Sequence, residues 1–396
     1  MKMKKALVLI SLGLTLVLFA GCGNSNVSNN NQSGGNKAAE TNKDPYTIGM
    51  LTATTGPMAL MGDGQAKAIN MLTEQINAAG GVNGHPIKLV TYDTGSKAEE
   101  AVKGYGSLIE QGALAIVGPI GNSEGKAVAP LAQENKVLSY SLSGSYKPAN
   151  PYMFAVSVQT QYMFQAVVEY LKTKGVKNLA MLATSDSSGQ DGVDALTELL
   201  KNETSIKMVQ LERVNPADID VTPQVNNIKA KKPDAIIVYC SGTPATVALK
   251  NIYQAGINVP IIVNHGNLTF GFLESIQGFA PKQLYIPATK DFGWEGLAND
   301  DPQKSVNEKM HNDYQQKYGK DTDYGAATAY DVFNLLVKAL GEVGPDKEKI
   351  RSYIENTTNY VGAEAIYNFS PQDHRGTNRK DVIMARIVGT KFEMAK

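Results

Sequence analysis

The sequence predicts an α/β protein built from two similar lobes. Apolar runs of strand length alternate with segments of helix length, in which apolar residues recur every three or four positions. The alternation occurs in two successive series, one before and one after Pro151, with glycine or proline turns between the elements. Strands joined through helices of this length favour right-handed crossovers and parallel sheets. Two series therefore predict two parallel sheets, each covered by helices.

The first series begins with a strand over residues 46–51, which runs into the turn Thr54-Thr55-Gly56-Pro57. A helix is expected from Asp63, because apolar residues follow at helical spacing until Gly80-Gly81 ends it. The same alternation then predicts a strand over 87–92, a helix over 98–111, a fully apolar strand over 113–117, a helix over 123–134 and a strand over 137–142.

The second series follows Pro151. It predicts helices over 162–174, 192–201, 222–231 and 246–254, and strands over 179–183, 208–213, 235–239 and 260–263. After Leu284 the alternation does not continue simply. The remaining pattern predicts a long helix over 324–340 and a last strand over 383–388.

The first 44 residues predict export and attachment to a membrane. A basic start, an apolar run over 6–20 and the small residue Gly21 before Cys22 are the parts of an export signal over residues 1–21. The run is shorter than the roughly 20 residues that a membrane span requires. A cysteine at the cut is the bacterial lipoprotein pattern, in which Cys22 is acylated. The alternative is an ordinary secretory signal that contains a cysteine. Residues 22–44 are poor in apolar side chains and are expected to form a disordered tether.

Composition limits what the exported part can do. Residues 22–396 suit two domains of ordinary size. Lysine and arginine number 38, as do aspartate and glutamate, and loss of the three lysines in residues 1–21 leaves a mildly acidic mature chain. The sequence has no basic patch that would indicate a nucleic-acid partner. No apolar run within 45–396 is long enough to span a bilayer. The chain has two cysteines, so lipidation of Cys22 would leave Cys240 without a disulfide partner in the chain.

Several segments carry a resemblance to a known family. They are the run from Ile76 to Asp93, Thr55-Gly56-Pro57 with Gly62, Val117-Gly118-Pro119, Ala329-Tyr330-Asp331, and the run from Phe369 to Gly376. Together, behind the export signal, these segments resemble the type I periplasmic binding proteins of the leucine/isoleucine/valine class. The resemblance implies two Rossmann-like lobes, joined by a hinge of three strands, that close on a solute like a Venus flytrap.

The resemblance also implies lobe boundaries. Lobe 1 is expected to comprise residues 45–157 and 289–364, and lobe 2 residues 158–288 and 365–396. The chain would cross between the lobes near 156–159, 287–290 and 363–368. Ligands in such folds bind outside the carboxyl ends of the parallel strands.

The first candidate site residues are Asn122 and Ser123, which follow an apolar strand and begin a helix. Free N–H groups at a helix start favour an anion, and in similar proteins this turn holds the carboxylate of the solute. The alternative is that Ser123 only caps its helix. Ser143 and Ser145 follow the next strand, and the resemblance places backbone and hydroxyl groups there against the polar end of the solute. The alternative is a polar surface loop.

Further candidates each have a second interpretation or depart from the class. Met61 falls where the class often carries a large apolar wall, and it is equally a plain core residue. Ser188 and Ser241 occupy positions that often carry tyrosines in amino-acid binders, which implies a wider or more polar pocket. Tyr324 and Tyr162 could supply an aromatic surface to the solute. The alternative is that both pack between a helix and the core.

The most consequential departure from the class is His265. Amino-acid binders carry a carboxylate near this position, which pairs with the α-ammonium of the ligand, whereas an imidazole is a poor partner for a cation. Asp186 and Glu274 are possible substitutes, but neither occupies the matching position. The hypothesis is a carboxylate or amide ligand, aromatic or aliphatic, without an α-ammonium, and with His265 bonded to a second polar group. The alternative is a turn at Asn264-His265 that faces solvent.

The sequence does not favour an enzyme. His85, His265, His311 and His374 are isolated, without a metal-ligand cluster, and Lys67 stands where a dinucleotide fingerprint needs glycine or alanine. No cofactor is expected. We expect a monomeric solute-binding lipoprotein on the outer face of the cytoplasmic membrane, serving an ABC permease and its ATPase. The alternative is a ligand-sensing module that feeds a separate receptor.

Overall fold

The computed structural model describes residues 43–395. These residues contain a five-stranded sheet in the order β2-β1-β3-β4-β5 and a seven-stranded sheet in the order β14-β13-β10-β9-β8-β6-β7, besides the short ribbon β11-β12. Every pairing in the five-stranded sheet is parallel. In the seven-stranded sheet β10 and β13, and β13 and β14, are antiparallel, and the other pairings are parallel. The expected α/β class with two sheet-based lobes is confirmed.

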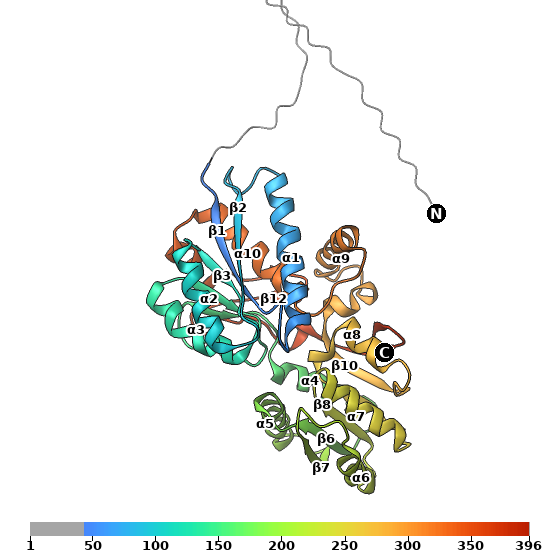
Figure 1. Cartoon of the computed structure of the whole chain (residues 1–396). Helices are drawn as coiled ribbons and strands as arrows, with labels where there is room; N and C mark the ends of the chain where they lie inside the picture. The colour runs from blue at the N-terminus through green and yellow to red at the C-terminus, as the bar shows by residue number, and fades with distance from the viewer. Residues whose placement is uncertain (1–42, 396) are drawn as a thin grey trace, which may run out of the picture. The chain divides into compact units, whose positions relative to one another are not determined.

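The first sheet is built mainly from the first series (Figure 1). Its strands and covering helices are β1 (Tyr46–Thr52), α1 (Ala59–Ala78), β2 (Ile87–Asp93), α2 (Ala98–Glu110), β3 (Ala115–Val117), α3 (Asn122–Asn135), β4 (Leu138–Ser141) and β5 (Met153–Ala155). Successive strand residues point to opposite faces. Ile48 and Met50 therefore pack with α1 and α10 (Ala326–Val343), whereas Leu51 packs with α2 and α3. Helix α11 (Lys347–Glu355) packs on α10.

The second sheet repeats this plan (Figure 1). Its elements are α4 (Thr160–Thr173), β6 (Asn178–Thr184), α5 (Ser187–Lys201), β7 (Lys207–Val214), α6 (Thr222–Ala230), β8 (Ala235–Tyr239), α7 (Thr243–Gln254), β9 (Ile261–Val263), α8 (Phe270–Ile276), β10 (Leu284–Thr289), β13 (Val382–Val388) and β14 (Lys391–Met394). Leu182 and Val238 pack with α6 to α8, and Met181 and Ile237 pack with α4 and α5. Each sheet is thus the middle of three layers.

Three stretches of chain pass between the two sheets. The first joins β5 to α4, and the second joins β10, through a short 3-10 segment (Lys290–Gly296), to α9 (Lys304–Tyr318), which packs on α1. The third joins the ribbon strand β12 (Ile366–Tyr367), which pairs with β11 (Tyr360–Val361), to β13. Because Tyr367 and Phe369 pack in the core of the first sheet, we propose that the last lobe boundary lies beyond Phe369 rather than at residue 364.

Several element boundaries differ from the expectation. Helix α1 begins at Ala59 rather than at the expected Asp63, because its first turn contains Gly62, a residue of low helix propensity that hid the turn in the sequence pattern. Helix α5 begins at Ser187 rather than Gly192, since the Asp186 side chain caps it. Helix α10 begins at Ala326 rather than Tyr324, because the capping residue Gly325 adopts a left-handed conformation with φ of 86°. Strand β10 extends the second series by one parallel strand, which the sequence pattern did not predict.

The predicted signal peptide, Cys22 and most of the predicted tether lie outside the described residues. Among residues 43–395, no helix is both long enough and apolar enough to cross a bilayer.

Candidate ligand-binding site

The loop after β4 carries Ser143 and Ser145. Their hydroxyl oxygens lie 3.2 Å apart, and both residues are partly buried. The Tyr146 N–H donates to the Ser143 carbonyl at 3.3 Å, which folds the loop into a turn. The two hydroxyls therefore lie side by side at the carboxyl end of a parallel strand, as the sequence predicts for a solute-binding loop.

His265 begins the short 3-10 turn η1 (His265–Asn267) after β9. Its side chain is only 9% exposed, so the alternative of a solvent-facing turn is wrong. Burial lowers the pKa of His265 to about 4, which leaves the imidazole neutral at pH 7. Its Nδ1 atom is buried without a hydrogen-bond partner among residues 43–395. A buried polar atom without a partner is costly to stability.

The loop that holds His265 is fixed by its neighbours. Asn264 accepts the Gly266 N–H at 2.9 Å. The Asn267 amide donates to the Cys240 carbonyl at 2.8 Å and accepts the Gly242 N–H at 2.8 Å. The loops after β8 and β9 are therefore tied together, and the orientation of His265 is set by side chains that sequence reasoning did not single out.

Four of the predicted residues lie around His265. The Tyr324 ring centroid is 6.4 Å from the His265 ring centroid. A Cβ placed on Gly144, between the two loop serines, would lie 3.8 Å from His265 Nε2, and one placed on Gly266 would lie 2.7 Å from Ser241 Oγ. Ser143, Ser145, Ser241 and Tyr324 thus border His265, directly or through a neighbouring residue.

Tyr324 precedes α10 and joins the two sheets. Its N–H donates to the Leu268 carbonyl at 3.2 Å, next to the turn that holds His265. Burial, with the nearby Glu364 carboxyl, raises the pKa of Tyr324 to about 12, while a hydrogen bond with Ser157 acts in the opposite direction. The phenol is therefore neutral and able to donate. Tyr162, on α4, is partly buried against the core of the second sheet.

Met61 lies on α1 beside the residue that follows Tyr324. A Cβ placed on Gly325 would lie 2.9 Å from the Met61 carbonyl oxygen. The Met61 side chain is partly buried against the core of the first sheet. The packing role that the sequence allowed is therefore present, and contact with a solute stays a prediction.

Asn122 is the first residue of α3, and its Oδ1 atom is buried without a partner among the described residues. Ser123 is exposed, and it is not the N-cap residue as the alternative supposed, because Gly121 occupies that position. The Gly121 N–H donates to Glu124 Oε2 at 2.7 Å. The N–H groups of the next residues remain oriented out of the helix, where an anion is favoured.

Ser188 is exposed in the first turn of α5, and within the described residues no contact links it to the group around His265.

The two carboxylates that could substitute as ammonium partners, Asp186 and Glu274, have other surroundings. Asp186 accepts the Gly189 N–H and the Thr184 hydroxyl, both at 2.8 Å, and so caps α5. Glu274 is exposed on α8. Neither substitute matches the expected position of an ammonium partner.

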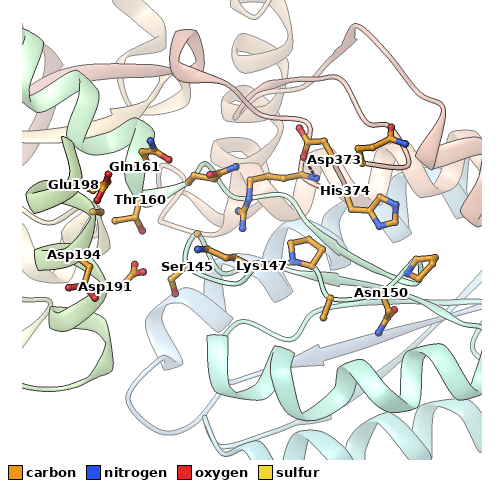
Figure 2. A pocket seen from close by; sticks show the side chains of 18 of the residues that line it. Ser145, Lys147, Asn150, Thr160, Gln161, Asp191, Asp194, Glu198, Asp373 and His374 are labelled. Carbon is orange, nitrogen blue, oxygen red and sulfur yellow. Dashed lines mark hydrogen bonds between the residues drawn. The ribbon is translucent and has the colours of Figure 1, made fainter. Parts of the chain in front are cut away.

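A cavity of about 730 Å³ opens beside the serine loop (Figure 2). Of the predicted residues, only Ser145 lines it. One wall is acidic, because Asp191, Asp194 and Glu198 recur along one face of α5, and Lys147 also lines the cavity. The other lining residues are Gly144, Pro148, Ala149, Asn150, Pro151, Gln159, Thr160, Gln161, Ala195, Pro371, Gln372, Asp373, His374 and Arg375. The volume is within the usual range of about 300–1,000 Å³ for small-molecule pockets.

Arg375 is a site residue that sequence reasoning missed. Its side chain is 3% exposed, and its guanidinium donates to the carbonyls of Ser157, Tyr146 and Ser143. Burial lowers the pKa of Arg375 to about 10, so it keeps its charge at neutral pH. The family resemblance marked the run from Phe369 to Gly376, but nothing in that run indicated which of its side chains turns inward.

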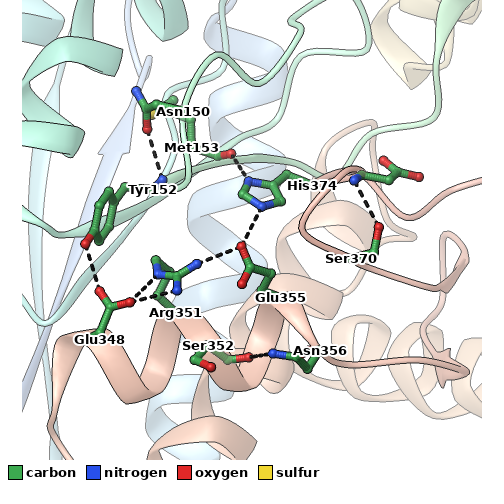
Figure 3. A network of polar contacts seen from close by, with 11 residues as sticks. Asn150, Tyr152, Met153, Glu348, Arg351, Ser352, Glu355, Asn356, Ser370 and His374 are labelled. Atoms are coloured by element: carbon green, nitrogen blue, oxygen red, sulfur yellow. Dashed lines mark hydrogen bonds and ion pairs between the residues drawn. The ribbon is translucent and has the colours of Figure 1, made fainter.

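A polar network holds the run that carries Arg375 (Figure 3). His374 Nε2 lies 3.0 Å from Glu355 Oε1, and His374 Nδ1 lies 3.2 Å from the Met153 carbonyl. Arg351 donates to Glu355 at 2.7 Å. The His374 ring also stacks on Phe154, with 4.2 Å between ring centroids. This histidine is therefore a structural anchor between the loop, β5 and α11.

The other isolated histidines have structural partners too. His85 stacks on Tyr46, and His311 stacks on Trp294 and contacts Asp321. Within the described residues, no three histidine, cysteine, aspartate or glutamate side chains are grouped as a metal site requires. Burial raises the pKa of the Cys240 thiol to about 12, which makes it a poor nucleophile.

Comparison with known proteins identifies the family. The chain matches the family model described as periplasmic binding protein over residues 45–391. A curated relative, the leucine-, isoleucine-, valine-, threonine- and alanine-binding protein of Pseudomonas aeruginosa, is 23% identical over 80% of this chain and 83% of that protein. Leu/Ile/Val-binding protein homolog 3 of Brucella melitensis is 25% identical over 56% of this chain and 61% of that protein, so the chain spans less than two thirds of its length.

A solved structure has the same fold. The branched-chain amino acid transporter substrate-binding protein LivJ of Streptococcus pneumoniae, in complex with isoleucine, is 22% identical, with a TM-score of 0.76 over 89% of this chain and 99% of that chain. These relatives are solute-binding proteins rather than enzymes. The chain therefore belongs to the periplasmic binding protein family, as a type I solute-binding protein similar to the leucine/isoleucine/valine class.

Proposed function

We propose that this protein is the solute-binding lipoprotein of an ABC importer, which captures a small carboxylate-bearing solute and delivers it to a membrane permease. The observation that carries this proposal is the group of polar side chains around His265, at the carboxyl ends of strands from both sheets. Closure of two lobes on a solute uses groups from both in this way. The names of the relatives, which bind branched-chain amino acids, support a solute of similar size.

We further propose that the cargo is a carboxylate or an amide without an α-ammonium. The neutral His265 supplies no negative charge for an ammonium, and its unpaired Nδ1 suits a second polar group of the cargo. The carboxylate of the cargo would bind near Asn122 and the serine loop, with Ser143 and Ser145 as hydrogen-bond donors. Met61, Ser123, Ser188, Ser241 and Tyr324 complete the proposed set.

Calorimetry on the purified mature protein tests the cargo proposal. The panel comprises leucine, glutamate, benzoate and short amides, and benzoate or an amide is expected to bind more tightly than leucine. His265→Glu is the matched variant, because it restores a carboxylate at this position and is expected to raise the affinity for leucine. Tight leucine binding by the unmodified protein, with no response to the acids and amides, would overturn this proposal.

The membrane anchor is tested separately. Cells that express the full chain would be labelled with a radioactive fatty acid, and the protein is expected to take up label and to sediment with membranes. Cys22→Ser is expected to abolish the label and release the protein into the soluble fraction. Label on the Cys22→Ser chain would show that Cys22 is not the acylated residue.

A further inference from the structure

We infer that Arg375 is a positioning residue for the solute-binding loop, and that it couples this loop to the stretch of chain between β12 and β13. The inference rests on the proposed role of Ser145 in binding. Arg375 lies on the third stretch that passes between the sheets, and two of its three carbonyl partners, Ser143 and Tyr146, belong to the loop that carries Ser145. The third partner, Ser157, lies on the first such stretch.

The geometry suits arginine and no other side chain. A guanidinium presents several N–H donors in one rigid plane, so a single side chain can hold carbonyls from separate segments in fixed directions. Lysine has a compact charge on a flexible stem and does not reproduce that fork. Within the residues that the structure describes, Arg375 forms no ion pair with a carboxylate, so backbone carbonyls supply its hydrogen bonds. The charges of Asp373 and Glu364 nearby also favour its charged form.

The base of the side chain is itself held in place. The Arg375 N–H donates to Asp373 Oδ1 at 2.9 Å. The carbonyl of His374 accepts the Ala155 N–H at 3.0 Å, which ties this stretch to β5. Stacking of His374 on Phe154 adds a second attachment. The guanidinium is therefore fixed to the edge of the first sheet, and the serine loop is held from there.

Loss of the Arg375 guanidinium should change the conformation of the loop, because it removes the donor to the Ser143 and Tyr146 carbonyls. The Ser143 and Ser145 hydroxyls lie 3.2 Å apart only while the loop keeps its turn. Once the carbonyls of Ser143 and Tyr146 lose their charged donor, the loop should sample other conformations, and only part of the population would present both hydroxyls. The apparent affinity for the solute falls in proportion to the fraction of molecules whose loop is in the binding-competent conformation.

Hydrogen–deuterium exchange on the unliganded protein tests this directly. Arg375→Met is expected to speed exchange about tenfold or more at the amides of residues 142–148, and Arg375→Lys to a smaller extent. Arg213→Met is the matched control, because it removes an arginine that also donates to a backbone carbonyl, that of Thr184 at 2.9 Å, but not to this loop. Unchanged exchange at 142–148 in Arg375→Lys and Arg375→Met would overturn the inference. If Arg375→Met does not fold, Arg375→Lys decides alone.

A double-mutant cycle gives the second readout. With leucine or benzoate as the probe, whichever binds the unmodified protein, Arg375→Lys and Ser145→Ala are each expected to weaken binding. Their combination should weaken it less than the product of the two effects, since the lysine variant already misplaces Ser145. Multiplicative effects would mean that Arg375 acts only on general stability. If neither probe binds, the cargo proposal is at fault, and the exchange experiment still decides the role of Arg375.

Discussion

Glu364 Oε1 accepts the backbone N–H of Val158 at 3.3 Å and so joins two residues that are 206 positions apart in the chain. Val158 lies on the first stretch that passes between the sheets, and Glu364 precedes the third. The other carboxyl oxygen of Glu364 is buried without a partner among residues 43–395. Because burial penalises the charged form, a buried carboxyl group with an unpaired oxygen is more stable when protonated.

Glu364 shares this interior with two more carboxyl groups. Burial is the main cause that raises the pKa of Asp291 to about 6, of Asp331 to about 7 and of Glu364 to about 8. The charge of Asp291 also raises the pKa of Asp331 and that of Glu364. The charge of Asp331 raises the pKa of Glu364 further. Asp331 accepts the N–H groups of Ala363 and Glu364 and the Tyr367 hydroxyl. The three groups therefore titrate within the physiological range.

We predict that the protein is less stable at pH 8.5 than at pH 6.5. Each of these carboxyls has a higher pKa in the folded state than its ordinary value of 3.8 or 4.5. Its contribution to stability is full below that ordinary value and is lost as the pH rises through the folded value. His265 does not interfere in this window, because its pKa is lowered and it gains protons only at lower pH. Urea denaturation at the two pH values checks this, and equal midpoints would contradict it.

Glu364→Gln should flatten this dependence on pH. Glutamine keeps an oxygen for the Val158 N–H but has no proton to lose, so one of the three titrations disappears. The measured quantity is the difference between the urea midpoints at pH 6.5 and pH 8.5. The control is Glu274→Gln, which changes an exposed carboxylate on α8 and should keep the dependence of the unmodified protein. An unchanged difference in Glu364→Gln would show that Glu364 does not titrate in this range.

The sequence predicted most strands of the two sheets because they are short runs bounded by turns, and the central ones, such as β3 and β8, are fully apolar. Ile48 and Leu51 already show the alternation that packs opposite faces of one strand. Helix starts were predicted less well, because they depend on capping. Asp186 caps α5 well before the first residue that the apolar pattern marks as helical. Strand β10 was missed because Pro287 stands inside its run, and a proline in such a run argues against a strand.

The sequence indicated which loops could form the candidate site, but not the contacts that hold those loops in place. The loops after β4 and β9 follow from the strand order, so Ser145 and His265 could be chosen from the sequence. The burial of His265 depends on Tyr324 and Gly144, which are distant in the sequence. Arg375 contacts carbonyl groups rather than side chains, and no residue pattern records such contacts.

Gly189→Ala should lower stability by about 1–3 kcal/mol. A Cβ at this position of α5 would lie 1.9 Å from the Thr184 carbonyl oxygen, so either the helix or the end of β6 must move. Gly62 on α1 has the same relation to Ala53, at 2.0 Å, which shows that the two lobes share this close approach. Gly278→Ala is the control, since its Cβ would meet no atom within 4 Å. Equal urea midpoints for the two variants would contradict the prediction.

Cys240 should be unreactive in the folded protein. Its side chain is 1% exposed, and its raised pKa keeps the thiol protonated. A Cys22→Ser chain, in which Cys240 is the remaining thiol, should react with an aromatic disulfide reagent in urea and hardly at all in buffer. Reaction in buffer at the rate of a free thiol would mean that the loop after β8 opens readily.

Ser145→Ala should weaken solute binding about threefold to tenfold while leaving the melting temperature nearly unchanged. The Ser145 side chain is partly buried, and the described contact of its hydroxyl is the one with Ser143 at 3.2 Å, which contributes little to folding. Ser145 lines the cavity, and in the proposed function its hydroxyl donates a hydrogen bond to the bound carboxylate or amide. Calorimetry and thermal unfolding measure the two effects, with Ser205→Ala, at an exposed serine after α5, as the control. A large fall in melting temperature with unchanged affinity would make Ser145 a structural residue and move the binding role to Ser143 or His265.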